Sequence, residues 1–296
     1  MPFRLHNPHL AELADDTLYH FGLSKSNTNF KDFGDVKFVC TGGSRSRLNM
    51  YAQAFGKRFG LEVIGDISRS DRFCLYKTGA VLWVNHGMGV PSLSIMLNEL
   101  YKLLHYAGIT EVTIIRLGTC GGVGIEPGTV VITNGTLNGK LKECYELEIN
   151  GRTVAFECPL DQQLSQDLYH VAIELRYSAT LGKTLCANDF YEGQMRLDGS
   201  FYRGEQKEKM EFLHKLQTLG VKNIEMECTG FAAMNHRVGA RCNTAIVCVA
   251  LLNRMHGDQV QINETEYKEM ELRPFYIVST YIGNQLGYNP VLNVNL

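Results

Sequence analysis

Two arginines follow a pair of glycines at the end of an apolar, strand-like run. The run is Val36–Thr41, the glycines are Gly42 and Gly43, and the arginines are Arg45 and Arg47, which open a helical stretch. Glycine amides, a helix start and guanidinium groups at one place would converge on an anion, for which phosphate is the natural candidate. The alternative is a plain strand-to-helix turn whose arginines are solvated.

A further arginine, Arg116, lies inside the apolar run Val112–Leu117, which the glycine-rich segment 118–122 follows. A charge inside a buried strand costs several kcal/mol unless it is paired, so we expect an anionic partner for Arg116. That partner is either a bound anion or a buried Asp or Glu. The glycines after the run, Gly121 among them, leave room for a ligand to approach the backbone.

Gln194 and Arg196 lie two residues apart in the segment 189–196. If this segment is extended, the two side chains face the same side. Glutamine both donates and accepts hydrogen bonds, whereas arginine only donates, so the pair suits a planar imide. The alternative is an ordinary surface loop.

Two carboxylates, Glu225 and Glu227, lie in the segment 223–228, which reads as a short strand entering a helix. One carboxylate can accept hydrogen bonds from vicinal hydroxyls while the other caps the helix start, where negative charge is favoured. The alternative gives both carboxylates a role at the helix start.

Apolar runs rich in β-branched residues alternate along the chain with stretches of helical periodicity. We expect strands at 37–41, 80–85, 112–117, 128–133 and 244–252. We expect helices at 92–106, 161–175, 205–219, 228–236 and 267–285. The alternation predicts an α/β fold around a mixed sheet. Because no linker, low-complexity tract or repeat divides the chain, we expect one domain over residues 1–296, with residues 1–17 as an N-terminal extension.

Composition narrows the class of partner. The 29 Lys and Arg residues balance 31 Asp and Glu residues, so no basic excess attracts nucleic acid or a membrane surface. No run approaches the ~18–20 apolar residues of a membrane span, and the start lacks the apolar run of a signal peptide. Nine cysteines show no C-x-x-C pair and no metal-ligand spacing, which indicates reduced thiols. We therefore expect a cytoplasmic protein that acts on a small molecule and holds no metal.

Two segments match a nucleotide-binding motif only in part. The segment 122–127 starts like a dinucleotide-binding loop but has Pro127 in place of the third glycine. The segment 182–184 resembles the end of a P-loop but has Tyr177 where that motif requires its first glycine. Neither segment indicates a bound nucleotide cofactor.

Blocks spread over most of the chain resemble those of a known family. They are LYHF at 18–21, FGDVKFVCTGGSRSR at 33–47, DRFCLYK at 71–77, HGMGVPSLSIML at 86–97, IIRLGTCGGVGIEPGTVVIT at 114–133, DFYEGQMRLDG at 189–199, NIEMEC at 223–228 and LLNR at 251–254. In this order and spacing they resemble the uridine phosphorylases of the nucleoside phosphorylase superfamily, in its animal-type branch. The resemblance runs from about Leu18 to the end of the chain.

The resemblance implies a mixed, distorted central β-sheet flanked by α-helices and a homodimer whose active sites are shared between subunits. It also implies a pentosyltransferase that cleaves uridine reversibly with inorganic phosphate to uracil and ribose 1-phosphate, in pyrimidine salvage and catabolism. Phosphate is then a co-substrate, and no cofactor is needed.

Site residues follow from the resemblance position by position. The phosphate site comprises Gly43, Arg47, Arg116 and Thr119, with Arg72 reaching in from the neighbouring subunit. The ribose contacts are Thr119, Met226 and Glu227, with His20 from the neighbouring subunit. The uracil contacts are Phe190, Gly121, Gln194 and Arg196. The residues that the resemblance implies for catalysis are Gln194, Arg196 and Arg116.

Two kinds of alternative stay open. One is a related enzyme, either a purine nucleoside phosphorylase or a nucleosidase that uses water, although the arginines at 47, 72 and 116 argue against water. The pair Gln194 and Arg196 argues against a purine base, whose larger ring system would need a different set of contacts. The other is a catalytically silent paralogue that only binds a nucleoside.

Overall fold

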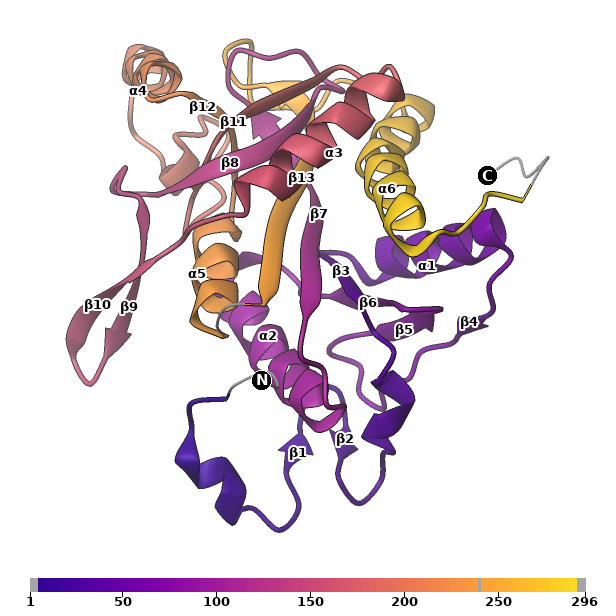
Figure 1. The fold of residues 1–296 in the computed structure, drawn as a ribbon. Helices are drawn as coiled ribbons and strands as arrows, with labels where there is room; N and C mark the ends of the chain where they lie inside the picture. The colour runs from indigo at the N-terminus through magenta and orange to yellow at the C-terminus, as the bar shows by residue number, and fades with distance from the viewer. Residues whose placement is uncertain (1–4, 239–240, 292–296) are drawn as a thin grey trace. The chain divides into compact units, whose positions relative to one another are not determined.

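The structure is a computed structural model that describes residues 5–238 and 241–291 (Figure 1). Its contacts divide the chain into two compact units. Unit 1 comprises Met1–Ile115, Met234–Asn243 and Ile282–Leu296, and unit 2 comprises Arg116–Ala233 and Thr244–Tyr281. The expected single domain over residues 1–296 stays a prediction.

Unit 1 contains four neighbouring strands in the order β3-β6-β5-β4. Their bounds are β3 Phe38–Gly42, β4 Val63–Ile64, β5 Leu75–Thr78 and β6 Val81–Asn85. β3 and β6 run parallel, whereas β5 is antiparallel to both β6 and β4. All five residues of β3 and of β6 are buried, which explains why these strands read as continuous apolar runs rather than as alternating ones.

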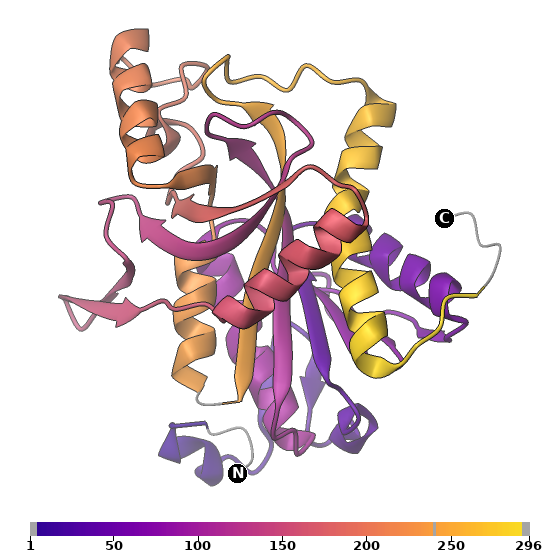
Figure 2. The same ribbon diagram turned by 45° about the horizontal axis from the view of Figure 1, so that its top comes forward.

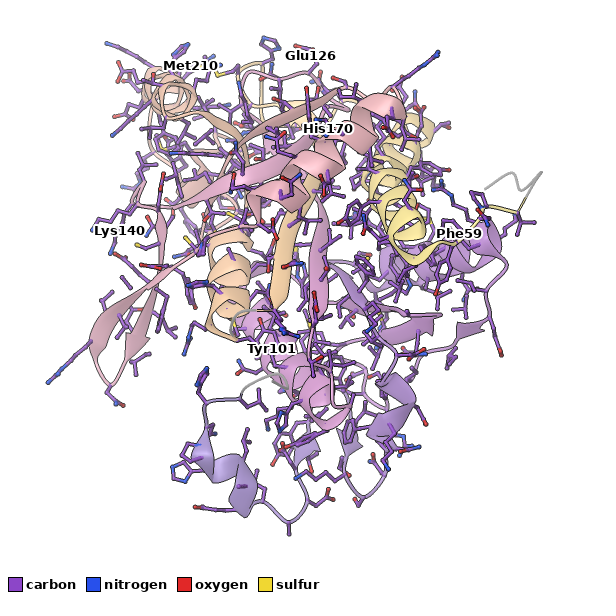
Figure 3. The ribbon with its side chains drawn as sticks, in the orientation of Figure 1. Phe59, Tyr101, Glu126, Lys140, His170 and Met210 are labelled. Atoms are coloured by element: carbon purple, nitrogen blue, oxygen red, sulfur yellow. The ribbon has the colours of Figure 1, made fainter. Side chains whose placement is uncertain are left out.

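Helix α1 (Arg45–Phe59) follows β3 after a short turn and packs on the strands of unit 1. The Ser44 side chain caps its start by accepting from the backbone N–H of Arg47, and Gly60 ends it in the left-handed conformation at φ 66°. On its buried face the Phe55 ring lies 5.4 Å from Trp83 and 4.7 Å from Phe59, whose position is labelled in Figure 3. The helix is therefore held by an aromatic cluster rather than by helix propensity alone.

Helix α2 spans Gly89–Tyr106 and begins three residues before the predicted start at Ser92. Pro91 lies inside its first turn, where a missing N–H removes no hydrogen bond because first-turn N–H groups have no helical acceptor. Two short strands, β1 (Thr17–Leu18) and β2 (Leu23–Ser24), form a separate hairpin in the same unit.

Unit 2 contains a mixed sheet in the order β12-β11-β8-β13-β7. The bounds are β7 Val112–Gly122, β8 Val130–Asn138, β11 Ala179–Cys186, β12 Val221–Glu225 and β13 Cys242–Asn253, where β7 and β13 each begin with residues of unit 1. β11 is parallel to both β8 and β12, and β13 is antiparallel to β8. A separate hairpin, β9 (Cys144–Ile149) with β10 (Arg152–Glu157), was not predicted.

Helices cover the strands of unit 2. Helix α3 (Gln162–Glu174) packs across β8 and β11 (Figure 2), and α4 (Gln206–Thr218), which carries the labelled Met210 in Figure 3, packs on β12. The remaining helices are α5 (Cys228–Val238) and α6 (Glu264–Leu286). The α/β class with a mixed sheet flanked by helices is confirmed. Among the described residues, none of the helices combines the length and apolar character needed to cross a bilayer.

Candidate functional site

The predicted site residues fall in both units. Unit 1 carries His20, Gly43, Arg47 and Arg72. Unit 2 carries Arg116, Thr119, Gly121, Phe190, Gln194, Arg196, Met226 and Glu227.

The junction between β3 and α1 is built as the sequence predicted, a strand running into a helix start. Gly43 is closely packed, because a Cβ at this position would lie 3.0 Å from the backbone oxygen of Gly87. The first N–H groups of α1 and the half-buried Arg47 follow at once. A helix start of this kind attracts anions, so the phosphate role of Gly43 and Arg47 stays a prediction that the local geometry permits.

Arg45 holds a neighbouring loop instead of facing solvent alone. Its Nη1 lies 3.2 Å from Oδ2 of Asp66, and its Nη2 donates to the backbone oxygen of Ser70 at 3.1 Å. Ser70 in turn accepts the backbone N–H of Arg72 through its hydroxyl at 3.2 Å. The Arg72 side chain itself is 72% exposed. Arg45 therefore fixes the loop that presents Arg72 at the surface of the subunit.

His20 is clamped by Glu99 on α2. The Glu99 carboxylate accepts the backbone N–H of His20 at 2.9 Å and of Phe21 at 3.0 Å, and lies 2.7 Å from Nδ1 of the His20 ring. Since an ionised carboxylate only accepts, Nδ1 carries the proton and Nε2 is left as the ring atom for a ligand. Glu99 was not predicted, although a charged residue among the apolar positions of this helix is the signal that could have identified it.

Arg116 lies between two carboxylates in unit 2. Its Nη1 is 2.8 Å from Oε2 of Glu225, its Nη2 contacts Oε2 of Glu227, and all three side chains are buried. Burial alone would lower the pKa of Arg116, but the two carboxylates outweigh it and raise that pKa well above its usual value. The buried salt bridge offered as an alternative for Arg116 is therefore present.

The glycines after Arg116 make room for side chains of the chain itself. β7 continues through Gly122 instead of ending at Leu117, and a Cβ on Gly118 would lie 3.2 Å from Nη1 of Arg116. A Cβ on Gly121 would lie 3.0 Å from the side chain of Arg254. A side chain at Gly118 or Gly121 would therefore meet these arginines. Approach of a ligand to the backbone of these glycines, and the uracil contact of Gly121, stay predictions.

Glu225 caps helix α5. Its carboxylate accepts the backbone N–H of Glu227 at 3.0 Å and of Cys228 at 2.9 Å. Burial raises the pKa of Glu225, the charge of Arg116 opposes this, and Glu227 adds to the rise. Glu225 is therefore the helix cap. The hydroxyl-binding role of Glu227, which contacts Arg116 and lies next to the half-buried Met226, stays a prediction.

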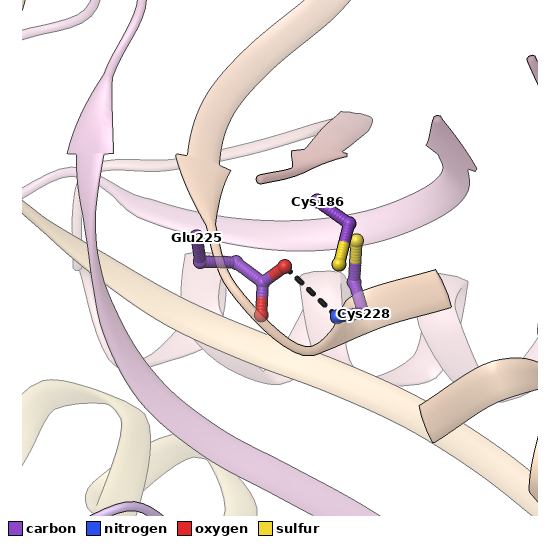
Figure 4. Close-up of side chains that lie close together, drawn as sticks. All are labelled: Cys186, Glu225 and Cys228. Carbon is purple, nitrogen blue, oxygen red and sulfur yellow. Dashed lines mark hydrogen bonds between the residues drawn. The ribbon is translucent and has the colours of Figure 1, made fainter. Parts of the chain in front are cut away.

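Cys186 and Cys228 lie beside Glu225 and form with it a group of potential metal ligands within the described residues (Figure 4). The two Glu225 oxygens already accept N–H groups of Glu227, Cys228 and Arg116. Burial raises the pKa of the Cys228 thiol well above its usual value, which opposes the thiolate that a metal needs. This group fits a helix cap in the core better than a metal centre.

Gln194 and Arg196 are both buried, so the surface-loop alternative is wrong for their side chains. Their segment is not extended, however, because Glu192–Gln194 forms a 3₁₀ turn (η3) and Met195 has φ +53°. Asp189 shapes the turn by accepting the backbone N–H groups of Tyr191 and Gly193 at 2.8 and 2.9 Å. The condition for the predicted alignment, an extended segment, is therefore not met.

Arg196 is fixed on three sides. Asp198 accepts from Nε at 3.0 Å and from Nη2 at 2.8 Å, and the backbone oxygen of Asp258 accepts from Nη2 at 2.6 Å. The guanidinium carbon lies 4.5 Å from the ring centroid of Phe190, a cation–π contact. These contacts leave the orientation of Nη1 determined by the fold.

Arg254 is a functional candidate that the sequence reasoning missed. It is completely buried, and its Nη2 donates to the backbone oxygen of Gln194 at 2.7 Å while Nη1 lies 3.4 Å from Oε1 of the same residue. Its Nε donates to Asp258 at 2.8 Å. Its position at the end of an apolar strand is the same signal that identified Arg116, so this residue could have been found.

Comparisons with known proteins agree with the fold and the motifs. The family model of the phosphorylase superfamily matches residues 37–282. A Caenorhabditis elegans protein described as uridine and thymidine phosphorylase is 52% identical over 92% of this chain and 92% of its own length. The crystal structure of uridine phosphorylase from Schistosoma mansoni in complex with 5-fluorouracil matches with a TM-score of 0.91 and 41% identity, covering 95% of this chain and 98% of that one. A second Schistosoma mansoni relative, described as inactive uridine phosphorylase B, is 38% identical over 95% of this chain and 96% of its own length.

Proposed function

The chain belongs to the phosphorylase superfamily, and we propose that it is a uridine phosphorylase, which transfers the ribosyl group of uridine to inorganic phosphate. The reaction is reversible and yields uracil and ribose 1-phosphate. Inorganic phosphate is its co-substrate, and the proposed mechanism needs no cofactor. Pyrimidine salvage and catabolism in the cytoplasm are the metabolic setting that this activity serves.

The observation that carries the proposal is the buried pair Gln194 and Arg196, called the base-reading pair below. Within the described part of the chain, Nε2 of Gln194 and Nη1 of Arg196 donate to no other residue. Oε1 of Gln194 keeps a lone pair beside its long contact to Arg254. The imide edge of uracil presents one N–H between two carbonyl oxygens, which matches two donors and one acceptor.

The same donors assist the chemistry. Phosphate attacks C1′ of the ribose, the C–N bond breaks through an oxocarbenium-like sugar, and the electron pair leaves with uracil. Negative charge then develops on the uracil oxygens, where donors fixed in advance stabilise the transition state more than bound uridine. The uracil anion takes up a proton after the bond has broken.

Phosphate itself needs positioning more than activation, because it is already anionic. We assign this task to Gly43, Arg47, Arg116 and Thr119, with Arg72 from the neighbouring subunit. The start of α1, which carries Arg47, adds the positive end of a helix dipole to the guanidinium group of that residue. The contacts of Arg116 give it a second task, which is to hold Glu227 in a fixed orientation.

The ribose contacts are Glu227, Met226 and Thr119, with His20 of the neighbouring subunit at the 5′-hydroxyl. Glu227 accepts hydrogen bonds from the vicinal hydroxyls, and the Glu99 clamp leaves Nε2 of His20 for the 5′-oxygen. Phe190 forms the wall beside the nucleoside, and Gly121 contributes its backbone to the uracil site.

A homodimer with shared sites makes a quantitative prediction. We expect the homodimers of Arg72→Ala and of Arg196→Met each to be nearly inactive. In each homodimer, both active sites lack one of the two arginine side chains. When subunits mix at random, half of the dimers are mixed and each of these has one intact site, so about a quarter of wild-type activity returns. No recovery after unfolding and refolding the mixture would refute the shared site.

One alternative function is supported by a specific observation. The chain is also similar to a relative described as inactive, so it could be a catalytically silent paralogue. The test incubates the protein with uridine, with and without millimolar phosphate, and with inosine as the purine control. We expect uracil to appear only with phosphate, matched by ribose 1-phosphate, and inosine to stay intact. Binding of uridine without any product would establish the silent paralogue instead, and cleavage of inosine would indicate a purine nucleoside enzyme.

A further inference from the structure

Asp258 lies in the segment between β13 and α6 and is 8% exposed. Sequence reasoning gave it no role, and it belongs to none of the phosphate, ribose or uracil contacts assigned above. A buried carboxylate has to be paired or hydrogen-bonded, so its partners show what it supports.

Those partners come from three segments of the chain. One carboxylate oxygen, Oδ1, accepts from Nε of Arg254 and from Nζ of Lys209, both at 2.8 Å. The other, Oδ2, accepts the backbone N–H of Leu197 at 3.0 Å. The backbone oxygen of Asp258 accepts from Nη2 of Arg196 at 2.6 Å. Asp258 therefore contacts Arg196, the residue after it, and the arginine that holds Gln194.

Lys209 completes the arrangement from α4. It is 4% exposed, and a buried ammonium group is stable only with a close anionic partner. Burial by itself raises the pKa of Asp258, but the hydrogen bonds from Lys209 and Leu197 and the charge of Arg254 outweigh it, so that pKa lies below its usual value. Asp258 is therefore a carboxylate at neutral pH and accepts from all of these donors together.

The charges of this network do not cancel. Lys209, Arg196 and Arg254 are cations and Asp198 and Asp258 are anions, so three positive against two negative charges leave a net charge of +1. A leaving uracil anion carries one negative charge. A network held rigidly with one excess positive charge suits that anion better than it suits neutral uridine.

We propose that Asp258, supported by Lys209, is a positioning residue that locks Gln194, Arg196 and Arg254 into one preorganised set of donors for the departing base. It touches neither uridine nor phosphate. Its effect passes through the base-reading pair, and the proposal rests on the function proposed above.

The central test is Asp258→Asn, which keeps the size of the side chain but removes the charge and turns one acceptor into a donor. We expect kcat for uridine to fall ~10- to 100-fold, less than the ~10²- to 10³-fold typical for loss of a direct transition-state donor. The KM for phosphate should change less than twofold, since no assigned phosphate contact is altered.

Leaving-group dependence separates positioning from general damage. Fluorine at position 5 stabilises the uracil anion, so 5-fluorouridine needs less help from the donors. We expect the loss in Asp258→Asn to be several-fold smaller for 5-fluorouridine than for uridine. Equal losses for both nucleosides, together with a changed phosphate KM, would mean that Asp258 is only structural.

Lys209→Met provides a second variant in case Asp258→Asn folds poorly. It leaves Asp258 paired with Arg254 and Leu197, so we expect the same pattern with a smaller loss in kcat. The matched control is Lys77→Met, because Lys77 is similarly buried and donates to Asp35 at 3.0 Å in unit 1. Unchanged kcat in Lys209→Met, or an equal loss in Lys77→Met, would overturn the proposal.

Uracil affinity, measured by calorimetry, distinguishes failure of this inference from failure of the proposed function. Wild-type protein that produces no uracil refutes the function alone. In that event we still expect Asp258→Asn to bind uracil about tenfold more weakly, a change of about 1.4 kcal/mol. Equal affinities in wild type and variant would refute the positioning role whether or not the protein is an enzyme.

Discussion

Replacing Arg116 by Met leaves Glu225 and Glu227 buried without their shared counterion. The two carboxylates are only 2% and 7% exposed and both contact the guanidinium in the wild type. Removing one partner of a buried ion pair typically costs ~3–5 kcal/mol, because the remaining charge is uncompensated. We expect Arg116→Met to lower the free energy of unfolding by about this amount near neutral pH.

The pH dependence gives this prediction its sign. Burial already raises the pKa of Glu225, and the Arg116 charge works against that rise, so its loss raises the pKa further. A carboxyl group whose pKa is higher in the folded state favours folding below its unfolded pKa, and this contribution is lost as the pH rises through the folded pKa. The difference in unfolding free energy between wild type and Arg116→Met should therefore be smaller at pH 5 than at pH 7.5. We expect it to shrink by more than half, that is by more than ~1.5–2.5 kcal/mol.

Urea unfolding of wild type and variant at several pH values between 5 and 8 measures the effect. Glu227→Gln added to Arg116→Met should recover at least half of the loss at pH 7.5, because only one buried carboxylate then lacks its cation. Arg45→Met is the control, since the pair of Arg45 with Asp66 is partly exposed and should contribute only ~0–1 kcal/mol without this pH trend. A deficit of equal size at every pH, with no recovery in the double variant, would refute the assignment.

Three further predictions concern selectivity. Wild-type protein should cleave cytidine at least tenfold more slowly than uridine, because the cytosine amino group meets the donor-only Arg196; comparable turnover would remove Arg196 from base recognition. Glu99→Gln should lower kcat/KM for uridine about tenfold and leave kcat/KM for 5′-deoxyuridine nearly unchanged, because a less firmly held His20 matters only when a 5′-hydroxyl is present. Equal losses for both nucleosides would argue against that role of His20. Glu227→Ala should reduce the preference for uridine over 2′-deoxyuridine, and a wild-type ratio in that variant would show that Glu227 does not bind the 2′-hydroxyl.

Elements marked by local chemistry could be predicted from the sequence. The apolar run at 37–41, the glycines and the following helix gave the β3–α1 junction because each signal lies within a few residues of the next. Arg116 is a similar case: a charge in an apolar strand requires a buried partner, and one is there. The choice between a ligand and Glu225 or Glu227 could not be made, because those residues come more than a hundred positions later.

What escaped prediction depends on contacts between distant segments. β7 was expected to end at Leu117 but continues through Gly122, and a Cβ at Gly118 or Gly121 would lie 3.2 or 3.0 Å from the side chain of Arg116 or Arg254. The alignment predicted for the base-reading pair depended on an extended segment, whereas a 3₁₀ turn and the left-handed Met195 carry the pair. Asp258 was missed because only Arg254, four residues earlier, is close to it in the sequence, whereas Arg196 and Lys209 lie 62 and 49 positions earlier.

The most direct test of uridine phosphorolysis uses phosphate labelled with oxygen-18 on all positions and follows the products by mass spectrometry. If a phosphate oxygen attacks C1′ while the C–N bond breaks, ribose 1-phosphate retains all of the label and forms in a one-to-one ratio with uracil. Uracil accompanied by free ribose with an oxygen from solvent would show that water is the nucleophile, and would contradict the phosphate role of Arg47, Arg72 and Arg116.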